Sequence, residues 1–321
     1  MAKHHDHNRH VLRQVFAPSP QNSILLRQSY PTLIQFRVHM KLLMFARPGG
    51  QPEPGVSDGS TITALSGAGY ADLHALIADP AGPATAAAYA ATATDHVAES
   101  AVKILAPLTR PEKILCVGLN YRDHAIESNM AIPTVPTIFS KFNNCIIGPG
   151  DDIVLPKVAQ TPDYEAEFAV VIGKPGKNIA EADWADHVFG YMNLHDVSAR
   201  DLQLATSQWL MGKSIDTFCP IGPYIVTKDE IADPHALPIK ATISGEVLQD
   251  SNTSELIFKL PKLLSYISQV MTLKSGDIIT TGTPAGVGFA RKPQRLLKAG
   301  DDCIIEVQGL GQLRNPVVSE A

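Results

Sequence analysis

Cysteine is scarce in this chain, and no two cysteines are spaced as a CxxC pair. The four residues are Cys116, Cys145, Cys219 and Cys303. Structural zinc sites usually take closely spaced cysteines, so the sequence argues against a site of this class. Because their neighbours are mostly apolar, we expect reduced thiols of an intracellular protein that pack as small hydrophobic residues.

Long apolar runs and an excess of basic residues are also missing. No stretch approaches the roughly 18 to 20 apolar residues that a membrane helix needs, so we expect no membrane association. The net charge of -5 offers no basic surface for nucleic acid. With 45% hydrophobic and 18% charged residues, the composition is that of a folded globular protein. A length of 321 residues suits one large domain plus a small one.

Acidic residues are nearly absent from residues 1–39, where Asp6 is the single acid. The basic residues of this segment are Lys3, Arg9, Arg13, Arg27 and Arg37. Segments that are rich in arginine and poor in acids resemble mitochondrial presequences. We therefore predict a presequence and a mitochondrial location. The alternative is a disordered tail on a cytoplasmic protein.

The rest of the chain divides into two regions with different sequence patterns. Residues 40–107 have weak patterns, with one strand starting near Met40 and helical pieces at 71–77 and 83–104, which predicts a small N-terminal domain. Residues 108–321 alternate short β-rich runs with Gly/Pro turns and contain one clear helix at 255–271, with its cap at Thr253 or Ser254. The predicted strands are residues 113–118, 137–142, 167–172, 190–194, 221–226, 239–244, 277–281 and 302–307. Many strands and few helices favour an α+β catalytic domain over a doubly wound sheet.

The segment around Glu165 and Glu167 carries the clearest chemistry. These residues lie two positions apart at the start of an apolar strand, so their side chains share one face. Asp196 follows the strand at 190–194 and can reach the same pocket. An unpaired buried carboxylate is costly, and a cation removes that cost. Three carboxylates without a nearby cysteine predict a hard divalent cation: Mg²⁺, Mn²⁺ or Ca²⁺. His195 is a further possible ligand, although adjacent strand residues point to opposite faces, which favours packing away from the site.

His124 and Glu127 form a second candidate pair. They lie three residues apart in a short helical turn after a strand, so their side chains face each other. A carboxylate beside a histidine orients the imidazole and supports its charged form, as a general base requires. On spacing alone, an exposed helix that carries both residues by chance is an equal alternative.

Four further residues have the chemistry to hold a substrate. Arg200 and Gln203 follow Asp196 on one helical face and can clamp a carboxylate or keto group. Lys213 can bind a developing enolate beside a metal. Thr283 lies in a glycine-rich loop that lacks the dinucleotide pattern GxGxxG, and its hydroxyl can hold a substrate carboxylate.

Taken together, these segments resemble the fumarylacetoacetate hydrolase superfamily. The likeness runs from about residue 113 to 317 and rests on six segments in order: GLNYRDHAIE, PTIFSKF, DYEAEFAVVIGK, NLHDVSARDLQ, GKSIDTFCPIGP and TGTPAGVG. It implies a mixed β-roll catalytic domain, a homodimer, and Mg²⁺ or Mn²⁺ held by Glu165, Glu167 and Asp196. It also implies proton transfer by His124 and Glu127. Around the substrate it places Lys213, Arg200, Gln203, Thr283 and Tyr121.

The resemblance further implies a shared reaction step on small 2-oxo acids. Chelation of a 2-oxo carboxylate or 1,3-dicarbonyl by the metal stabilises an enolate. The branch with the nearest motifs implies an oxaloacetate keto–enol tautomerase. The alternatives are an acylpyruvate- or fumarylpyruvate-type C–C hydrolase, an oxaloacetate decarboxylase, or, in another class, an inactive homologue that serves as a metal-binding scaffold.

Overall fold

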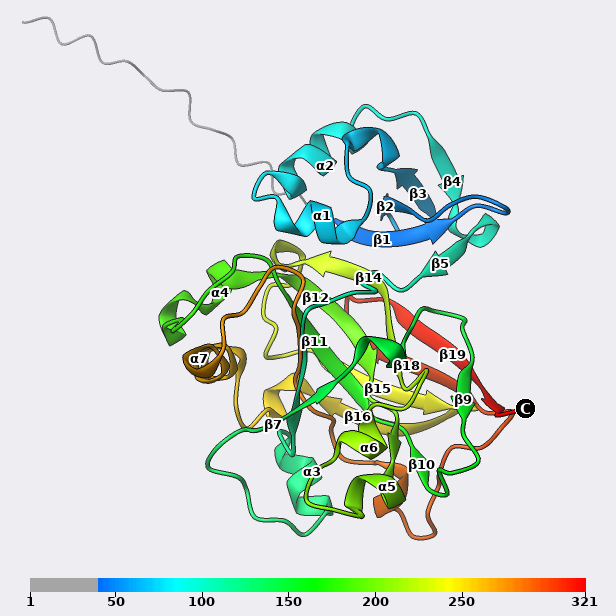
Figure 1. Cartoon of the computed structure of the whole chain (residues 1–321), viewed down its shortest axis with the longest axis vertical. Helices are drawn as coiled ribbons and strands as arrows, with labels where there is room; N and C mark the ends of the chain where they lie inside the picture. The colour runs from blue at the N-terminus through cyan, green and yellow to red at the C-terminus, as the bar shows by residue number, and fades with distance from the viewer. Residues whose placement is uncertain (1–39) are drawn as a thin grey trace, which may run out of the picture. The chain divides into compact units, whose positions relative to one another are not determined.

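The structure of the chain, a computed structural model, describes residues 40–321 (Figure 1). The predicted presequence lies outside the described residues. The described strands are β1 (Lys41–Ala46), β2 (Glu53–Ser57), β3 (Thr61–Ala64), β4 (His96–Ala98), β5 (Lys103–Leu105), β6 (Ile114–Gly118), β7 (Thr137–Lys141), β8 (Ile146–Ile147), β9 (Ile153–Leu155), β10 (Pro162–Asp163), β11 (Ala166–Ile172), β12 (Val188–His195), β13 (Ser198–Ala199), β14 (Cys219–Thr227), β15 (Pro238–Ile243), β16 (Glu246–Asn252), β17 (Ile278–Thr280), β18 (Asp302–Val307) and β19 (Gln312–Ser319).

The helices within residues 40–321 are short. The α-helices are α1 (Leu73–Ala78), α2 (Gly82–Ala90), α3 (Arg122–Glu127), α4 (Trp184–His187), α5 (Arg200–Leu204), α6 (Leu210–Lys213) and α7 (Leu260–Val270). The 3₁₀ turns are η1 (Ser66–Ala68), η2 (Glu99–Ala101), η3 (Asn143–Cys145), η4 (Glu181–Asp183), η5 (Lys228–Glu230), η6 (Thr253–Glu255) and η7 (Gly288–Ala290). None of the helices in 40–321 is long and apolar enough to cross a bilayer.

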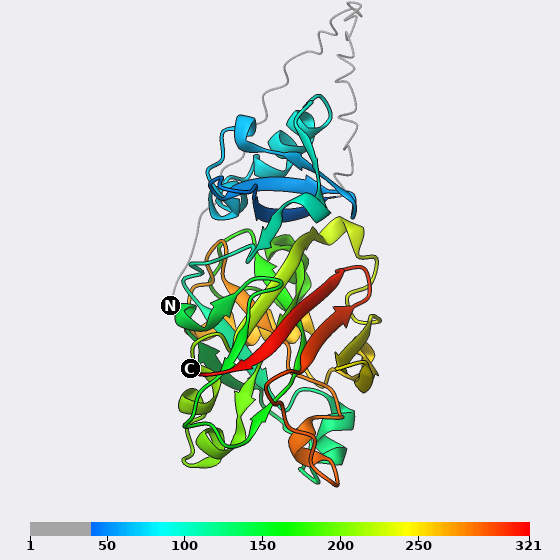
Figure 2. The same cartoon turned by 90° about the vertical axis from the view of Figure 1, so that its right-hand side faces the viewer.

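Most strands belong to two mixed sheets. The larger sheet has the order β4-β3-β2-β1-β14-β12-β11-β17-β6-β7, with β5 on β1 and β8 on β14. The smaller has the order β16-β15-β18-β19-β9, and Figure 2 shows β18 and β19 side by side in red and orange-red. Pairing is mainly antiparallel, and β17 pairs with β6 in parallel. This confirms the predicted α+β class, because a doubly wound sheet would be largely parallel.

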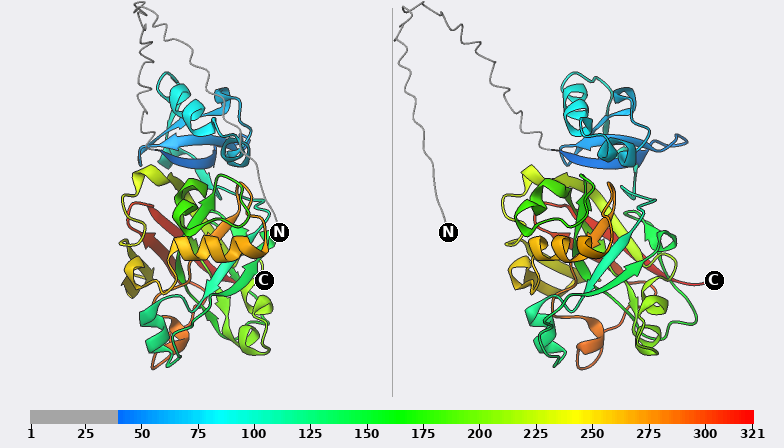
Figure 3. Two further views of the ribbon diagram at one scale, coloured as in Figure 1. Left: turned by 90° about the vertical axis from the view of Figure 1, so that its left-hand side faces the viewer. Right: turned by 60° about the vertical axis from the view of Figure 1, so that its left-hand side comes forward.

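The central strands are buried on both faces. All seven residues of β11 and all eight of β12 are buried, which explains their nearly continuous apolar sequences. Helix α7 contacts α4 on one side of this sheet (Figure 3). All four cysteines are buried and free, and burial raises the pKa of the Cys303 thiol, so these thiols are poor nucleophiles.

The eight predicted strands of residues 108–321 are all present, with ends that differ by at most two residues. The helix predicted at 255–271 is shorter than expected. Of its first residues only Glu255 lies in the turn η6, residues 256–259 are not helical, and α7 begins after Lys259, because Pro261 fits a first helical turn. The predicted cap at Thr253 or Ser254 was therefore wrong for this helix.

The second half of the helix predicted at 83–104 was also wrong. Helix α2 ends at Ala90, and the chain continues into β4 and β5. Alanine favours helix by intrinsic propensity, but pairing of β4 with β3 and of β5 with β1 overrides that preference. Because β1 also pairs with β14, the sheet runs on into the following region, and the domain boundary near residue 107 stays a prediction.

Candidate active site

A cavity of about 490 Å³ is lined by residues of α3, α5 and α6, three helices that lie near one another in Figure 1. Its walls come from β6, α3, α5, α6, the start of β11 and the loop after β17. The lining residues are Val117, Gly118, Leu119, His124, Glu127, Ser128, Met130, Phe139, Glu165, Glu167, Arg200, Gln203, Leu204, Trp209, Lys213, Gly282, Thr283, Val287, Phe289, Ala290 and Lys292. A large pocket with a few converging polar groups is the usual form of an enzyme site.

The three predicted metal ligands lie together at this cavity: Glu165 and Glu167 line it, and Asp196 is fully buried beside them. Strand β11 runs antiparallel to β12, so the start of one lies beside the end of the other. This brings Glu165 and Glu167 close to Asp196, and the Asp196 amide donates to the Glu165 carbonyl at 3.0 Å. One carboxylate oxygen from each residue lies within 4.8 Å of the other two. The sequence therefore placed this cluster correctly.

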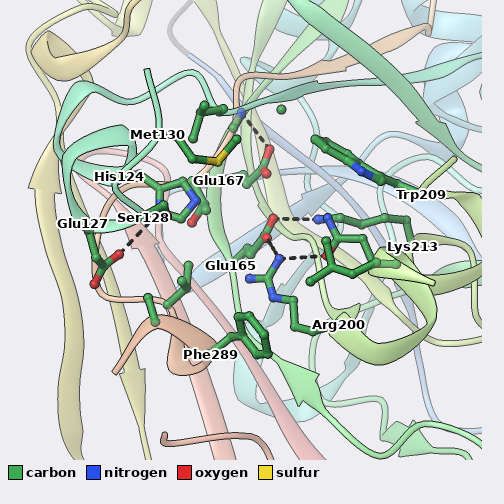
Figure 4. Close-up of a pocket in the computed structure, with 18 of the residues that line it drawn as sticks. His124, Glu127, Ser128, Met130, Glu165, Glu167, Arg200, Trp209, Lys213 and Phe289 are labelled. Atoms are coloured by element: carbon green, nitrogen blue, oxygen red, sulfur yellow. Dashed lines mark hydrogen bonds and ion pairs between the residues drawn. The ribbon is translucent and has the colours of Figure 1, made fainter. Parts of the chain in front are cut away.

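Basic side chains surround two of these carboxylates. Lys213 Nζ donates to Glu165 Oε2 and to Asp196 Oδ2, both at 2.8 Å. Arg200 Nη1 lies 2.6 Å from Glu165 Oε1. Figure 4 shows Lys213 and Arg200 both reaching toward Glu165. The third basic group, Lys141, is fully buried and donates to Asp196 Oδ1 at 2.6 Å.

The third carboxylate has a different environment. Burial would raise the pKa of Glu165, but the charges of Lys213 and Arg200 outweigh it and hold that pKa well below its usual value. Burial, followed by the charges of Asp196 and Glu165, instead raises the pKa of Glu167 well above normal. Without a cation, the folded protein therefore favours the neutral form of Glu167, as expected when several carboxyls share one buried site.

The loop after β17 fixes Glu167. The Thr280 hydroxyl and the Gly282 amide, the latter at 3.0 Å, both donate to Glu167 Oε2. Gly282 has a φ of +90°, and a Cβ there would lie 2.7 Å from the Val117 carbonyl oxygen. The glycine is thus required for this close approach.

The predicted dyad lies on the other side of the cavity from Lys213 (Figure 4). His124 Nδ1 is 3.4 Å from Glu127 Oε2, both on α3. The Gly286 amide donates to both Glu127 carboxylate oxygens at 2.9 and 3.0 Å, which ties α3 to the loop after β17. Burial would raise the pKa of Glu127, but the hydrogen bonds from His124 and Gly286 lower it overall. Glu127 is therefore an anion that can orient and support the imidazole.

The donor set of the inner cluster fits a divalent cation. Glu165, Glu167 and Asp196 are buried oxygen donors from three carboxylates, as hard cations require. The raised pKa of Glu167 shows that the basic groups, which bind the other two carboxylates, leave a charge on Glu167 uncompensated. A divalent cation would supply the missing positive charge, so the three carboxylates can hold one.

The structure brings most of the other predicted residues into the cavity lining. Arg200 begins α5, and its Nη1 donates to Gln203 Oε1 at 3.0 Å, so the two share one helical face as expected. Thr283 also lines the cavity, although its hydroxyl already donates to the Ala166 carbonyl at 2.9 Å. Lys213 has the position described above.

Tyr121 and His195 do not line the cavity. Tyr121 lies just before α3 and forms an isolated β-bridge with Leu256. Its side chain is fully buried in the core. A substrate-binding role for Tyr121 stays a prediction without structural support. His195 pairs with Ala166 in the ladder, and burial lowers the pKa of His195 to about 3, so it is a neutral core residue.

Sequence reasoning missed Lys141 and Asp163 as parts of the site. Asp163 accepts from Arg200 Nε at 2.9 Å and from the Gly288 and Phe289 amides, which locks the arginine in place. Lysine is rarely fully buried, so a lysine at the end of a strand is normally expected to be exposed to solvent. The available signal was the place of Lys141 in a short β-rich segment, after Ile138 and Phe139 and before Phe142.

The fold and this cluster define an enzyme family. Residues 113–318 match the family described as "Fumarylacetoacetate (FAA) hydrolase C-terminal". The chain therefore belongs to the fumarylacetoacetate hydrolase family, as its motifs predicted, and is an enzyme of that family.

Particular relatives are also similar over much of their length. The chain is 44% identical over 313 residues to "Oxaloacetate tautomerase FAHD2A, mitochondrial" of Bos taurus, covering 92% of this chain and 96% of the relative. It is 51% identical over 224 residues to "Oxaloacetate tautomerase fahd2, mitochondrial" of Xenopus laevis, covering 69% and 70%. Among solved structures, fumarylacetoacetate hydrolase from Exiguobacterium antarcticum aligns with a TM-score of 0.77 at 33% identity, covering 88% of this chain and 100% of that chain.

Proposed function

We propose that this chain is a divalent-metal-dependent oxaloacetate keto–enol tautomerase. The observation that carries the proposal is the arrangement of two groups across one cavity: the buried triad of Glu165, Glu167 and Asp196, and the pair His124–Glu127 opposite it. The relatives in cattle and frog carry the name oxaloacetate tautomerase. Proton movement between a carbon and an oxygen needs an acid–base group facing a stabilised enolate, which this arrangement provides.

The cofactor assigned to the triad is Mg²⁺ or Mn²⁺, with Ca²⁺ a weaker candidate because its oxygen ligands are more numerous. Held by Glu165, Glu167 and Asp196, the ion would polarise the 2-oxo group as a Lewis acid. Arg200 keeps Glu165 oriented through its own anchor on Asp163. The ammonium of Lys213, at the same carboxylates, can stabilise a developing enolate oxygen.

His124 is assigned the proton transfer at the carbon next to the keto group. Glu127, held by the Gly286 amide, keeps the imidazole oriented and supports its protonated form during the transfer. The walls formed by Trp209, Met130 and Phe289 are apolar and limit water around the enolate (Figure 4).

The wider setting is proposed on the same basis. The relatives are named as mitochondrial, and we assign the same location to this chain, in agreement with the basic residues 1–39. A homodimer is the proposed assembly, and the only proposed ligands are small 2-oxo acids and the cation.

A second candidate is an acylpyruvate-type C–C hydrolase, which shares the enolate step. The observation that favours it is the cavity volume of about 490 Å³, which leaves room for a substrate larger than a four-carbon acid. The ultraviolet absorbance of the enol separates the candidates when purified, Mg²⁺-loaded protein is given enol oxaloacetate or an acylpyruvate.

For a tautomerase, the enol signal of oxaloacetate decays faster with protein and no carbon–carbon bond is broken. Formation of pyruvate and a free acid from an acylpyruvate would instead establish the hydrolase, and release of CO₂ from oxaloacetate the decarboxylase. Bound metal with no turnover of any 2-oxo acid would contradict an enzymatic role and favour the scaffold alternative.

Replacement of the dyad histidine gives a prediction for this mechanism. His124→Gln is expected to lower kcat by about 100-fold or more, the usual contribution of a positioned acid–base group, while metal binding is retained. His96→Gln, at an exposed histidine on β4, serves as the control and should leave kcat unchanged. Steady-state rates with enol oxaloacetate measure both variants, and an unchanged kcat in His124→Gln would show that the dyad is structural.

A further inference from the structure

The positive groups that line the cavity differ in what already neutralises them. They are His124, Arg200, Lys213 and Lys292. Arg200 is bound to Asp163 and Glu165, and Lys213 to Glu165 and Asp196. His124 has Glu127 beside it. Lys292 is therefore the one lining residue of positive charge for which the described residues 40–321 supply no acidic partner.

Lys292 lies at the mouth of the cavity rather than at its inner end. It is exposed and follows the turn η7, from which Phe289 and Ala290 also line the cavity. The mouth is otherwise apolar: Met130, Leu204 and Phe289 are 56%, 57% and 38% exposed. A lysine ammonium on a flexible four-carbon stem can swing inward over such a surface.

The two ends of the cavity therefore suit two different parts of a ligand. At the inner end, Lys213 and Arg200 are already bound to Glu165, Asp196 and Asp163, so neither is free to pair with a second carboxylate of the substrate. Toward the mouth, that carboxylate would meet apolar side chains, where an unpaired anion is costly. The ammonium of Lys292 removes this cost by forming a charge-assisted hydrogen bond.

We propose that Lys292 binds the distal carboxylate of a dicarboxylic 2-oxo acid and so selects dioates over 2-oxo monoacids. This inference rests on the proposed function, because it takes the 2-oxo end of the ligand to lie at the triad. The inference adds Lys292 as the residue that binds the opposite end of the ligand. Lys292 has no part in the proton transfer, so it acts on substrate binding rather than on the chemical step.

The experiment compares two enols that differ in the distal group. Oxaloacetate carries a second carboxylate, and phenylpyruvate carries an apolar ring; both enols absorb in the ultraviolet. In Lys292→Met we expect KM for oxaloacetate to rise about 10-fold, the usual effect of losing one charge-assisted hydrogen bond, with kcat within about twofold. KM for phenylpyruvate, or its inhibition constant if it is not turned over, should stay the same or fall.

Two further variants complete the comparison. Lys292→Arg keeps the charge and should keep KM for oxaloacetate within about threefold of the wild type. Lys298→Met removes an exposed lysine that does not line the cavity and should leave both substrates unaffected. An unchanged KM for oxaloacetate in Lys292→Met, or equal changes for both enols, overturns the inference. Absence of wild-type turnover of either enol would instead contradict the proposed function itself.

Discussion

Glu167→Gln is expected to abolish binding of the divalent cation while leaving the metal-free protein at least as stable as the wild type. The raised pKa of Glu167 means that the folded, metal-free protein favours the neutral form of this carboxyl. Glutamine has nearly the same shape and is also neutral, so it fits the same environment. It cannot supply the negative charge that a cation needs, so activity should fall by about 100- to 1,000-fold, which corresponds to several kcal/mol of lost transition-state stabilisation.

The same pKa gives the variant a pH signature. A carboxyl whose pKa is raised by folding binds more protons in the folded state than in the unfolded state. Stability is then lost as pH rises from the unfolded value of about 4.5 toward the folded pKa. In the wild type without metal, the melting temperature should therefore fall over this range through Glu167. Glu167→Gln lacks that loss, so the gap between the two melting temperatures should widen from pH 5 to pH 8.

Glu165→Gln is the matched control for this prediction. The pKa of Glu165 is lowered because Lys213 and Arg200 bind its charged form. Removing that charge breaks two buried ion pairs and leaves Lys213 with Asp196 alone and Arg200 with Asp163 alone, which costs about 3–5 kcal/mol. Thermal unfolding in the presence of chelator should thus separate the two isosteric variants. Equal destabilisation by both would show that Glu167 is ionised in the metal-free protein and contradict the charge assignment.

Lys141→Met is the second variant with a large expected effect, and it acts on stability. Lys141 is fully buried beneath Asp196, and its ammonium also donates to the carbonyls of Val197 and Lys213. Its loss leaves the Asp196 carboxylate short of one buried partner, which should cost about 3–5 kcal/mol. Urea or thermal unfolding measures the change, and catalytic activity should fall with it because Asp196 is a ligand.

Two comparisons make this test specific. Lys240→Met removes an exposed ion pair with Asp250, 3.4 Å apart, and should change stability by no more than about 1 kcal/mol. In the double variant Lys141→Met/Asp196→Asn, both members of the buried pair are neutral, so stability should partly return. If the double variant is as unstable as the sum of the single variants, Lys141 stabilises the fold through its packing and not through Asp196.

The predictable parts of the fold were those with a strong local pattern. The strand at β11 shows a run of apolar residues, and the carboxylates at its start share a face by strand geometry alone. Strand β19 was missed because Pro316 and the polar residues Arg314 and Asn315 break its pattern, although pairing with β18 and β9 holds it in the sheet. The segment at β4 and β5 was wrongly predicted as helix because its alanines favour helix locally, whereas pairing with distant strands decides its structure.

The candidate site shows the same division. Glu165 and Glu167, and the dyad of His124 and Glu127, were predicted from short-range spacing, and Asp196 from its place after a separate apolar strand. Lys141 and Asp163 act through partners that are 55 and 37 residues away, so no local spacing marks them. Residue chemistry and the family resemblance both predicted the substrate-side residues, but neither showed that Arg200 is already occupied by two carboxylates or that Lys292 is not.

The most direct test of this account is to titrate metal-free protein with Mn²⁺ while following both the bound ion, by electron paramagnetic resonance, and the decay of enol oxaloacetate. The account predicts one Mn²⁺ bound per chain, recovery of activity in proportion to the bound ion, and loss of both in Glu167→Gln. Full tautomerase activity in the presence of chelator, with no bound metal, would contradict it.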